Sequence, residues 1–120
     1  MTHLSSEQLA QLKNALLENL RDIPVTIETL EKQDPFKDPE YVSDNASIDT
    51  DVREQMEHET VEAEILALRK KLNATEEALR RMDAGTYGMD EHSNEPIPFE
   101  RLQIMPEARH TIATEKRLVK

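Results

Sequence analysis

The sequence predicts a mainly helical protein built around an antiparallel helical hairpin, a coiled coil of two long helices. Three observations predict this fold class. The 120 residues include two glycines, 33% are charged and 3% are aromatic, which is typical of long helices rather than of a β-sandwich or barrel. Apolar residues recur at steps of three and four in two separate stretches, as they do along one face of a helix. Between these stretches lie Pro35 and Pro39, which favour an irregular connection.

The first helix is predicted over residues 5–33. Ser5, with Gln8 three positions later, has the form of a capping box. Pro24 lies inside the helical pattern, and because proline lacks a backbone N–H and crowds the preceding turn, we expect a kink or a break there. The apolar residues form one narrow stripe of the coiled-coil type: Leu9, Leu12, Leu16, Leu20, Ile23, Ile27 and Leu30.

The second helix is predicted to begin near residues 49–51 and to run to about Ala84. Asp49 or Thr50 can serve as its N-cap, and Asp51 is favourable at the positive end of the helix dipole. Gly85 follows the last periodic residue and is expected to cap the C-terminal end. The stripe consists of Val61, Ile65, Leu68, Leu72, Thr75, Leu79 and Met82, extended toward the N-terminal end by Val52 and Met56.

These patterns divide the chain into residues 1–85, a helical hairpin with its tip near residues 35–51, and residues 86–120, a small module with a C-terminal helix. Residues 89–105 are expected to be short and irregular. Within them "EPIPFERLQIM" (95–105) alternates proline with apolar residues, which predicts a small turn or a two-stranded ribbon. Pro106 is expected to open the last helix, because proline is favoured in the first helical turn.

The formal net charge of −10 disfavours direct binding to nucleic acid, whose phosphates repel an acidic surface. It suits a basic protein surface or channel, although acidity also serves simply to keep a small protein soluble. No apolar run approaches the length of a transmembrane helix. The N-terminus has no signal-peptide pattern, and the absence of cysteine argues against a disulfide-stapled secreted domain. A cytoplasmic protein without a membrane partner is therefore expected.

Enzymatic chemistry has little support in the sequence. There is no nucleophile elbow, and neither of the glycine-rich nucleotide-binding motifs is present. The stretch that begins at His58, "HETVE", lacks the second histidine of a metalloprotease motif. We expect a protein that is not an enzyme.

Residues 78–114 resemble the DksA/TraR family of bacterial RNA polymerase-binding regulators. The shared elements are "AL-RM--GTYG", "EPIP--RL" and "MPEAR". The family pattern carries two C-x-x-C pairs of a zinc finger, the first followed by a glycine. Asn94 stands at that glycine and still tolerates a positive φ. The four cysteine positions of the family are occupied here by Asp90, Ser93, Thr111 and Thr114.

The resemblance therefore implies a degenerate zinc-finger-like module held by packing instead of metal. Asp90, His92 and His110 offer an alternative ligand set, because zinc accepts aspartate and histidine. Serine and threonine are poor ligands, and both histidines are offset from the family's positions. Zinc is therefore not expected, and both histidines are interpreted as exposed polar residues. The expected replacement core is Ile97, Leu102, Ile104, Ile112 and Leu118.

The resemblance also implies a transcription regulator that inserts the acidic tip of its coiled coil into the secondary channel of RNA polymerase, in a stress response. The narrow apolar stripes favour a monomer. Asp49 and Asp51 are the acidic pair nearest the expected tip, with Asp44 as a further candidate. Their spacing departs from the family's D-x-x-D-x-A motif, and a purely capping role for these residues remains open. The alternative function is a structural or adaptor protein whose hairpin binds another protein.

Overall fold

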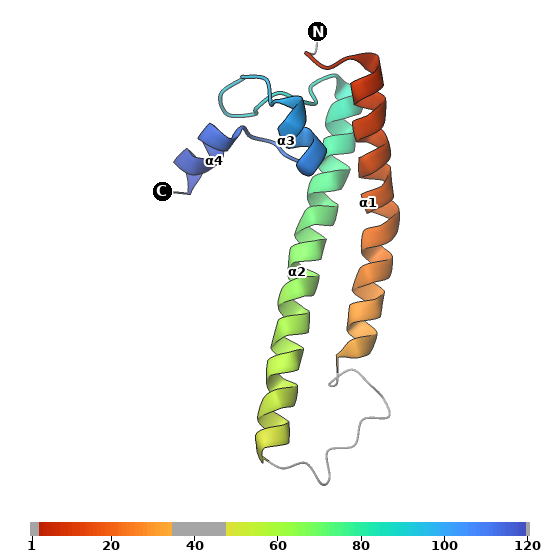
Figure 1. Cartoon of the computed structure of the whole chain (residues 1–120), viewed down its shortest axis with the longest axis vertical. Helices are drawn as coiled ribbons and strands as arrows, with labels where there is room; N and C mark the ends of the chain where they lie inside the picture. Colours follow the sequence, from red (N-terminus) through yellow and green to blue (C-terminus); the bar gives the residue numbers. More distant parts are fainter. Residues whose placement is uncertain (1–2, 35–47, 120) are drawn as a thin grey trace. The chain divides into compact units, whose positions relative to one another are not determined.

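The structure of the protein is a computed structural model that describes residues 3–34 and 48–119, with the side chains of residues 48–50 outside the description. Four helices lie within these ranges (Figure 1): α1 (Ser6–Gln33), α2 (Ile48–Ala84), α3 (Phe99–Ile104) and α4 (Ile112–Leu118). The described residues contain no strand, only an isolated antiparallel bridge between Met89 and Pro96. The prediction of a mainly helical fold with a long hairpin is confirmed.

Helix α1 begins at the predicted capping box. The backbone N–H of Ser5 donates to Oε1 of Gln8 (2.9 Å), and the N–H of Gln8 donates to Oγ of Ser5 (3.0 Å). The helix continues through Pro24, so the expected break is absent. Pro24 is exposed, and its ring deprives the helix of one hydrogen bond only, so the bonds on either side sustain it.

Helix α2 begins at Ile48. Asp49 and Thr50, predicted as caps, therefore lie inside its first turn, and the N-cap position falls outside the described residues. The C-terminal end matches the prediction, because Gly85 has a φ of 77°. The N–H of Gly85 donates to the carbonyl of Met82 (3.2 Å) and the N–H of Thr86 to that of Arg81 (2.9 Å). This pair of bonds is a Schellman motif, which satisfies carbonyls that the helix leaves free.

The chain forms two compact units, and each contains one part of α1 and one part of α2. The first unit comprises Met1–Arg21 and Lys71–Lys120, and the second comprises Asp22–Lys70. The sequence-based boundary between residues 85 and 86 stays a prediction. No described helix is both long enough and apolar enough to cross a membrane.

The core of the first unit joins the helices to the C-terminal module. Its buried residues are Leu4, Leu12, Leu16, Ala78, Tyr87, Ile97, Leu102 and Ala108. Ile97 and Leu102 are thus buried as predicted, but Ile104, Ile112 and Leu118 are exposed. Ile104 lies two residues after Leu102 on α3, so the two point to opposite sides of the helix. In helix α4 the buried residue is Thr114, whereas the apolar residues Ile112 and Leu118 are exposed.

The second unit buries Ile23 and Ile27 of α1 and Ile65 of α2, as the stripes predict. Val52 and Met56 are 52% and 61% exposed, so the predicted extension of the stripe is wrong. His58 already contacts Asp34, one residue beyond the end of α1. Met56 lies two residues and Val52 six residues before His58, at and beyond the level where α1 ends, so α1 does not cover them.

The C-terminal module differs from the prediction in two places. Residues 99–104 form α3 instead of part of a turn or ribbon, and the last helix begins at Ile112 instead of Pro106. Residues 106–111 are drawn into tertiary hydrogen bonds. Nε of Arg101 donates to the carbonyl of His110 (2.8 Å), and the N–H of Glu91 donates to the carbonyl of Arg109 (3.1 Å). Thr111 then caps α4 by accepting from the N–H of Thr114 (3.2 Å).

Candidate functional site

The turn that carries Asp90 is positioned by the two residues at its start. The hydroxyl of Tyr87, itself buried, donates to the carbonyl of Pro106 (2.7 Å). Burial raises the pKa of Tyr87, so the hydroxyl stays a donor. Gly88 has a φ of 90°, and a Cβ there would lie 3.1 Å from Cδ1 of Leu4. Both the backbone conformation and the close approach of the N-terminal segment therefore require glycine.

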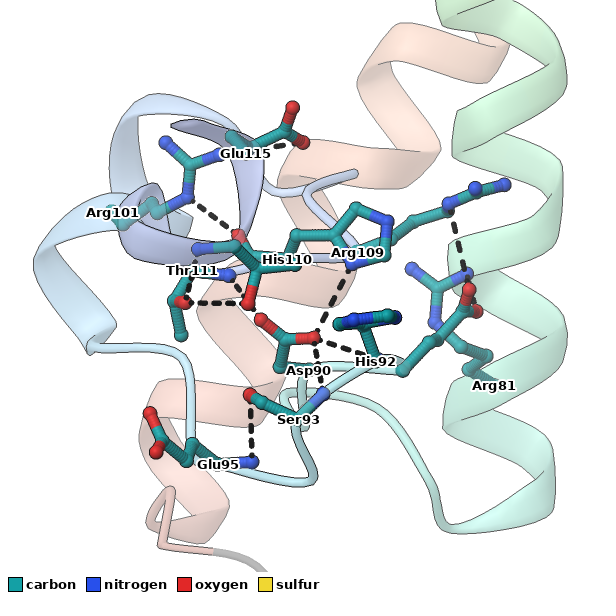
Figure 2. A network of polar contacts seen from close by, with 12 residues as sticks. Arg81, Asp90, His92, Ser93, Glu95, Arg101, Arg109, His110, Thr111 and Glu115 are labelled. Carbon is teal, nitrogen blue, oxygen red and sulfur yellow. Dashed lines mark hydrogen bonds and ion pairs between the residues drawn. The ribbon is translucent and has the colours of Figure 1, made fainter. Parts of the chain in front are cut away.

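The carboxylate of Asp90 is completely buried and lies at the centre of a polar network (Figure 2). Oδ1 accepts from the backbone N–H of His92 (2.8 Å) and of Ser93 (3.0 Å). Oδ2 accepts from the backbone N–H of Thr111 (2.7 Å), 21 residues away. One side chain therefore closes its own turn and ties that turn to the start of α4.

The four positions that the resemblance aligns with cysteines are brought together in this network. Oγ1 of Thr111 lies 3.2 Å from Oγ1 of Thr114, and the Thr114 side chain also hydrogen-bonds to Asp90. Ser93 follows in the same turn as Asp90, where its Oγ accepts from the N–H of Glu95 (3.4 Å). Asn94 has a φ of 61°, as its place after the turn predicts.

The hydrogen bonds set the charge of Asp90. Burial alone would raise the pKa of this carboxyl, because desolvation penalises the ionised form. Bonds from the Thr114 side chain and from the backbone of Thr111, Ser93 and His92 outweigh that effect and hold the pKa well below its usual range. Asp90 is therefore a buried anion with neutral donors around it.

These residues do not fit a zinc ion. Three backbone N–H groups point their positive ends at the Asp90 oxygens, whereas a cation needs converging lone pairs. The hydroxyls of Thr111 and Thr114 are occupied with each other and with the α4 N-terminus. Across residues 3–34 and 48–119, no group of three or more histidine, aspartate or glutamate side chains is arranged to hold a metal.

The two histidines near Asp90 have different surroundings. His92 is exposed, as predicted, and contributes its backbone N–H. His110 is buried, so its interpretation as an exposed residue is wrong. Its Nδ1 lies 3.3 Å from Oδ1 of Asp90, because the carbonyl of His110 is held by Arg101 and the ring then faces the turn.

A charged cluster links this module to α2 within the first unit. Arg109 reaches Glu77 of α2 (Nη1 to Oε2, 3.4 Å) and Glu91 of the Asp90 turn (Nε to Oε2, 3.5 Å). Glu91 also lies 3.5 Å from Nη1 of Arg81 on α2. Most of these side chains are partly exposed, so each pair contributes modestly. The cluster aligns the turn with the helix.

The predicted tip residues lie at or beyond the start of α2. Asp44 lies outside the described residues. Asp49 lies in the first turn of α2, with its side chain outside the description. Asp51 is exposed in that same turn, where its negative charge interacts favourably with the positive end of the helix dipole. Their assignment as a functional site stays a prediction.

A second polar site, in the unit that carries these residues, was not predicted. Oδ2 of the fully buried Asp34 lies 2.7 Å from Nδ1 of His58, and Nε2 of His58 lies 3.2 Å from Oε1 of Glu62. The His58–Glu62 spacing of four residues on one helix is visible in the sequence. The contact with Asp34 depends on how α1 and α2 align, which periodicity alone does not specify.

Comparison with known proteins assigns the family. No family model matches the chain. It is 30% identical over 118 residues to the RNA polymerase-binding transcription factor DksA of Caulobacter vibrioides, covering 95% of this chain and 78% of that protein. The chain belongs to the DksA/TraR family. It is also 32% identical over 120 residues to the uncharacterized protein YteA of Bacillus subtilis, covering 88% of this chain and 46% of that protein.

The fold agrees with a solved structure of the same family. Transcription factor DksA2 from Pseudomonas aeruginosa superposes with a TM-score of 0.78 at 24% identity, over 97% of this chain and 86% of that chain. This likeness supports the mainly helical fold of the chain. The DksA relatives are named as transcription factors and not as enzymes.

Proposed function

We propose that this protein is a transcription regulator that binds bacterial RNA polymerase and inserts the acidic tip of its hairpin into the secondary channel. The observation that carries the proposal is the match, over nearly the whole chain, to a relative named as an RNA polymerase-binding transcription factor. A protein of net charge −10 suits a basic channel better than it suits DNA. Direct nucleic-acid binding has no part in the proposal, and the protein acts as a monomer in the bacterial cytoplasm.

Asp49 and Asp51 are proposed to act at the tip, with Asp44 as a further contributor. Exposure of Asp51 in the first turn of α2 supports this role, because a charge there can both favour the helix dipole and reach a partner. The effect on transcription would come from these carboxylates, whereas affinity for polymerase would come from a wider surface. Binding and regulation should therefore be separable by substitution.

A second candidate function is an adaptor whose hairpin binds another coiled coil. Large apolar side chains remain exposed in the second unit, and this observation favours it: Val25, Val52, Met56 and Leu66. These side chains are available to pack against a helix of another protein. Regulation through polymerase remains the stronger proposal, because it rests on the whole-chain match to DksA.

The test is binding to purified bacterial core RNA polymerase in competition with a protein known to occupy the secondary channel. Asp49→Asn/Asp51→Asn is compared with the matched control Glu57→Gln/Glu64→Gln, which removes the same charge from exposed sites on α2. We expect competitive binding by all three proteins, with loss of the transcriptional effect only in the tip variant. Binding without competition would refute the channel assignment. No binding to polymerase would favour the adaptor.

A further inference from the structure

The C-terminal module has to hold together two turns that are distant in sequence. The first turn, residues 90–95, is closed by the N–H of Asn94 donating to the carbonyl of Asp90 (2.9 Å) and the N–H of Asp90 donating to that of Glu95 (2.8 Å). The second, residues 109–114, leads into α4. One hydrogen bond joins the backbones of the two turns directly: the N–H of Glu91 donates to the carbonyl of Arg109 (3.1 Å). The two turns are also joined by the partly exposed ion pair of Arg109 and Glu91 and by one completely buried side chain.

The buried side chain is that of Asp90, and each of its two carboxylate oxygens accepts hydrogen bonds from a different turn. Oδ1 accepts from the N–H groups of His92 and Ser93 in the first turn, and Oδ2 accepts from the N–H of Thr111 in the second. Figure 2 shows the carboxylate between the two turns, with His110 on one side and Thr111 on the other. The same carboxylate also meets the hydroxyl of Thr114. Removing either oxygen would leave partly buried donors without an acceptor.

The polarity of this centre is the reverse of a metal site. In a zinc finger, anionic thiolates converge on a cation. Here a single anion lies in the middle, and fixed N–H and O–H dipoles converge on it, an arrangement that favours negative charge and opposes a cation. Cysteine is absent from the chain, and the aligned positions Ser93, Thr111 and Thr114 present donors and caps instead of metal ligands.

We propose that the buried carboxylate of Asp90 is the organising centre of the module and cross-links its two turns in the place where a zinc finger would hold a metal ion. The cross-link is made by hydrogen bonds to one ionised side chain, so it needs neither metal nor thiols. The module therefore keeps its structure when metal is withdrawn and when oxidants are present. This property is independent of whether the protein binds RNA polymerase.

The first experiment measures thermal unfolding of the full chain with a strong chelator, with added zinc, and with neither. We expect the same midpoint in all three conditions, together with less than stoichiometric zinc in the purified protein. A lower midpoint with chelator would overturn the proposal, as would stoichiometric zinc that is lost together with structure.

The second experiment compares Asp90→Asn with Glu95→Gln. Glu95 is an exposed acid in the same turn, so its substitution controls for the change in net charge. Asparagine retains the shape of Asp90 but removes the charge and directs N–H groups at the surrounding donors. We expect the midpoint to fall by roughly 10 °C or more in Asp90→Asn and to stay within a degree or two in Glu95→Gln. Equal midpoints for the two variants would overturn the proposal.

Amide hydrogen exchange separates a local cross-link from general loss of folding, and it can be measured on the wild-type protein even when Asp90→Asn does not fold. In the wild type we expect the amides of His92, Ser93 and Thr111 to be protected. Where Asp90→Asn folds, protection should be lost at these amides and kept at Leu16, in the middle of α1. Fast exchange of the Thr111 amide in the wild type would contradict the cross-link.

Discussion

Among the residues that the structure describes, two aspartates are completely buried, one in each compact unit, and they are stabilised by different kinds of partner. Asp90 accepts hydrogen bonds from backbone N–H groups of two turns, none of which can lose its proton. Asp34 contacts the imidazole of His58, which in turn faces Glu62. A buried carboxylate needs several donors or a paired charge. The first unit meets this need mainly with backbone groups, together with the Thr114 hydroxyl and the nearby His110 ring. In the second unit, the side chain of His58 on the other helix faces Asp34.

The difference concerns what each aspartate organises. The Asp90 donors come from irregular chain, where hydrogen bonds to a side chain replace those that a helix would provide. The Asp34 pair lies where α1 has just ended and α2 is still regular, so it joins two helices instead of two irregular turns. Loss of Asp90 should therefore unravel local structure, and loss of Asp34 should loosen a contact between helices.

The largest effect is expected from Asp90→Ala, which removes the acceptor for three backbone N–H groups at once. We expect the free energy of unfolding to fall by about 4 kcal/mol, since each buried unsatisfied donor costs on the order of 1–3 kcal/mol and some are rehydrated. Urea denaturation measures this loss. Glu95→Ala in the same turn should change the free energy by less than about 0.5 kcal/mol. A loss of under about 1 kcal/mol for Asp90→Ala would mean that core packing alone holds the module.

Asp34→Ala should have a smaller effect, about 2 kcal/mol, although Asp34 is as deeply buried as Asp90. The side chain of His58 is 18% exposed and keeps its contact with Glu62, so water and Glu62 can satisfy it after the substitution. Hydrogen exchange should accelerate in the last turn of α1 and stay slow at Leu16. Lys32→Ala is the control, because Lys32 lies in the same turn and makes only an exposed ion pair with Glu28 among the described contacts. An effect as large as that of Asp90→Ala would erase the proposed difference between the two sites.

The pH dependence of stability distinguishes Asp90 further. Its pKa in the folded protein lies below the usual value, so its contribution is fully present above the pKa of the unfolded chain, about 3.9. The contribution is lost as pH falls further toward the folded pKa. The stability difference between wild type and Asp90→Asn should be smaller by roughly 1 kcal/mol at pH 3 than at pH 5. Chemical denaturation at these pH values provides the measurement, and a difference that grows on acidification would show that the sign is wrong.

The smallest effect is expected from Arg109→Gln, which removes the ion pairs of the first unit with Glu77 and Glu91. The side chains of Arg109, Glu77 and Glu91 are 46%, 36% and 43% exposed, so solvent screens these pairs. We expect a loss of about 0.5 kcal/mol that shrinks further at high salt. Urea denaturation at low and high salt tests this. A loss above about 2 kcal/mol would place the charged cluster, instead of Asp90, at the centre of the module.

The two long helices were predictable because their signals are local. The Ser5–Gln8 capping box, the stripe of leucines and isoleucines and the C-terminal Gly85 all act within a few residues of themselves. Of the kink or break predicted at Pro24, the break is absent, because the packing of the buried Ile23 and Ile27 offsets the loss of one hydrogen bond.

The C-terminal module was less predictable. The resemblance to the DksA/TraR family identified Asp90, Ser93, Thr111 and Thr114 as corresponding positions, and these residues do meet in one network. The burial of His110 was missed, and so were the start of α4 and the exposure of Ile104. All three features depend on hydrogen bonds or helical turns that residues distant in the sequence determine, so no local sequence pattern predicts them.

The sequence by itself determined where α1 and α2 form, how their apolar faces are spaced and which family the chain resembles, because helix periodicity and capping are properties of neighbouring residues. Only the tertiary structure decided what the two aspartates do. Asp90 meets Thr111 across 21 residues and Asp34 meets His58 across 24. The residues next to an aspartate in the sequence do not show whether its carboxylate will face water or be buried. Its role is therefore decided only when the folded chain brings hydrogen-bond donors to it.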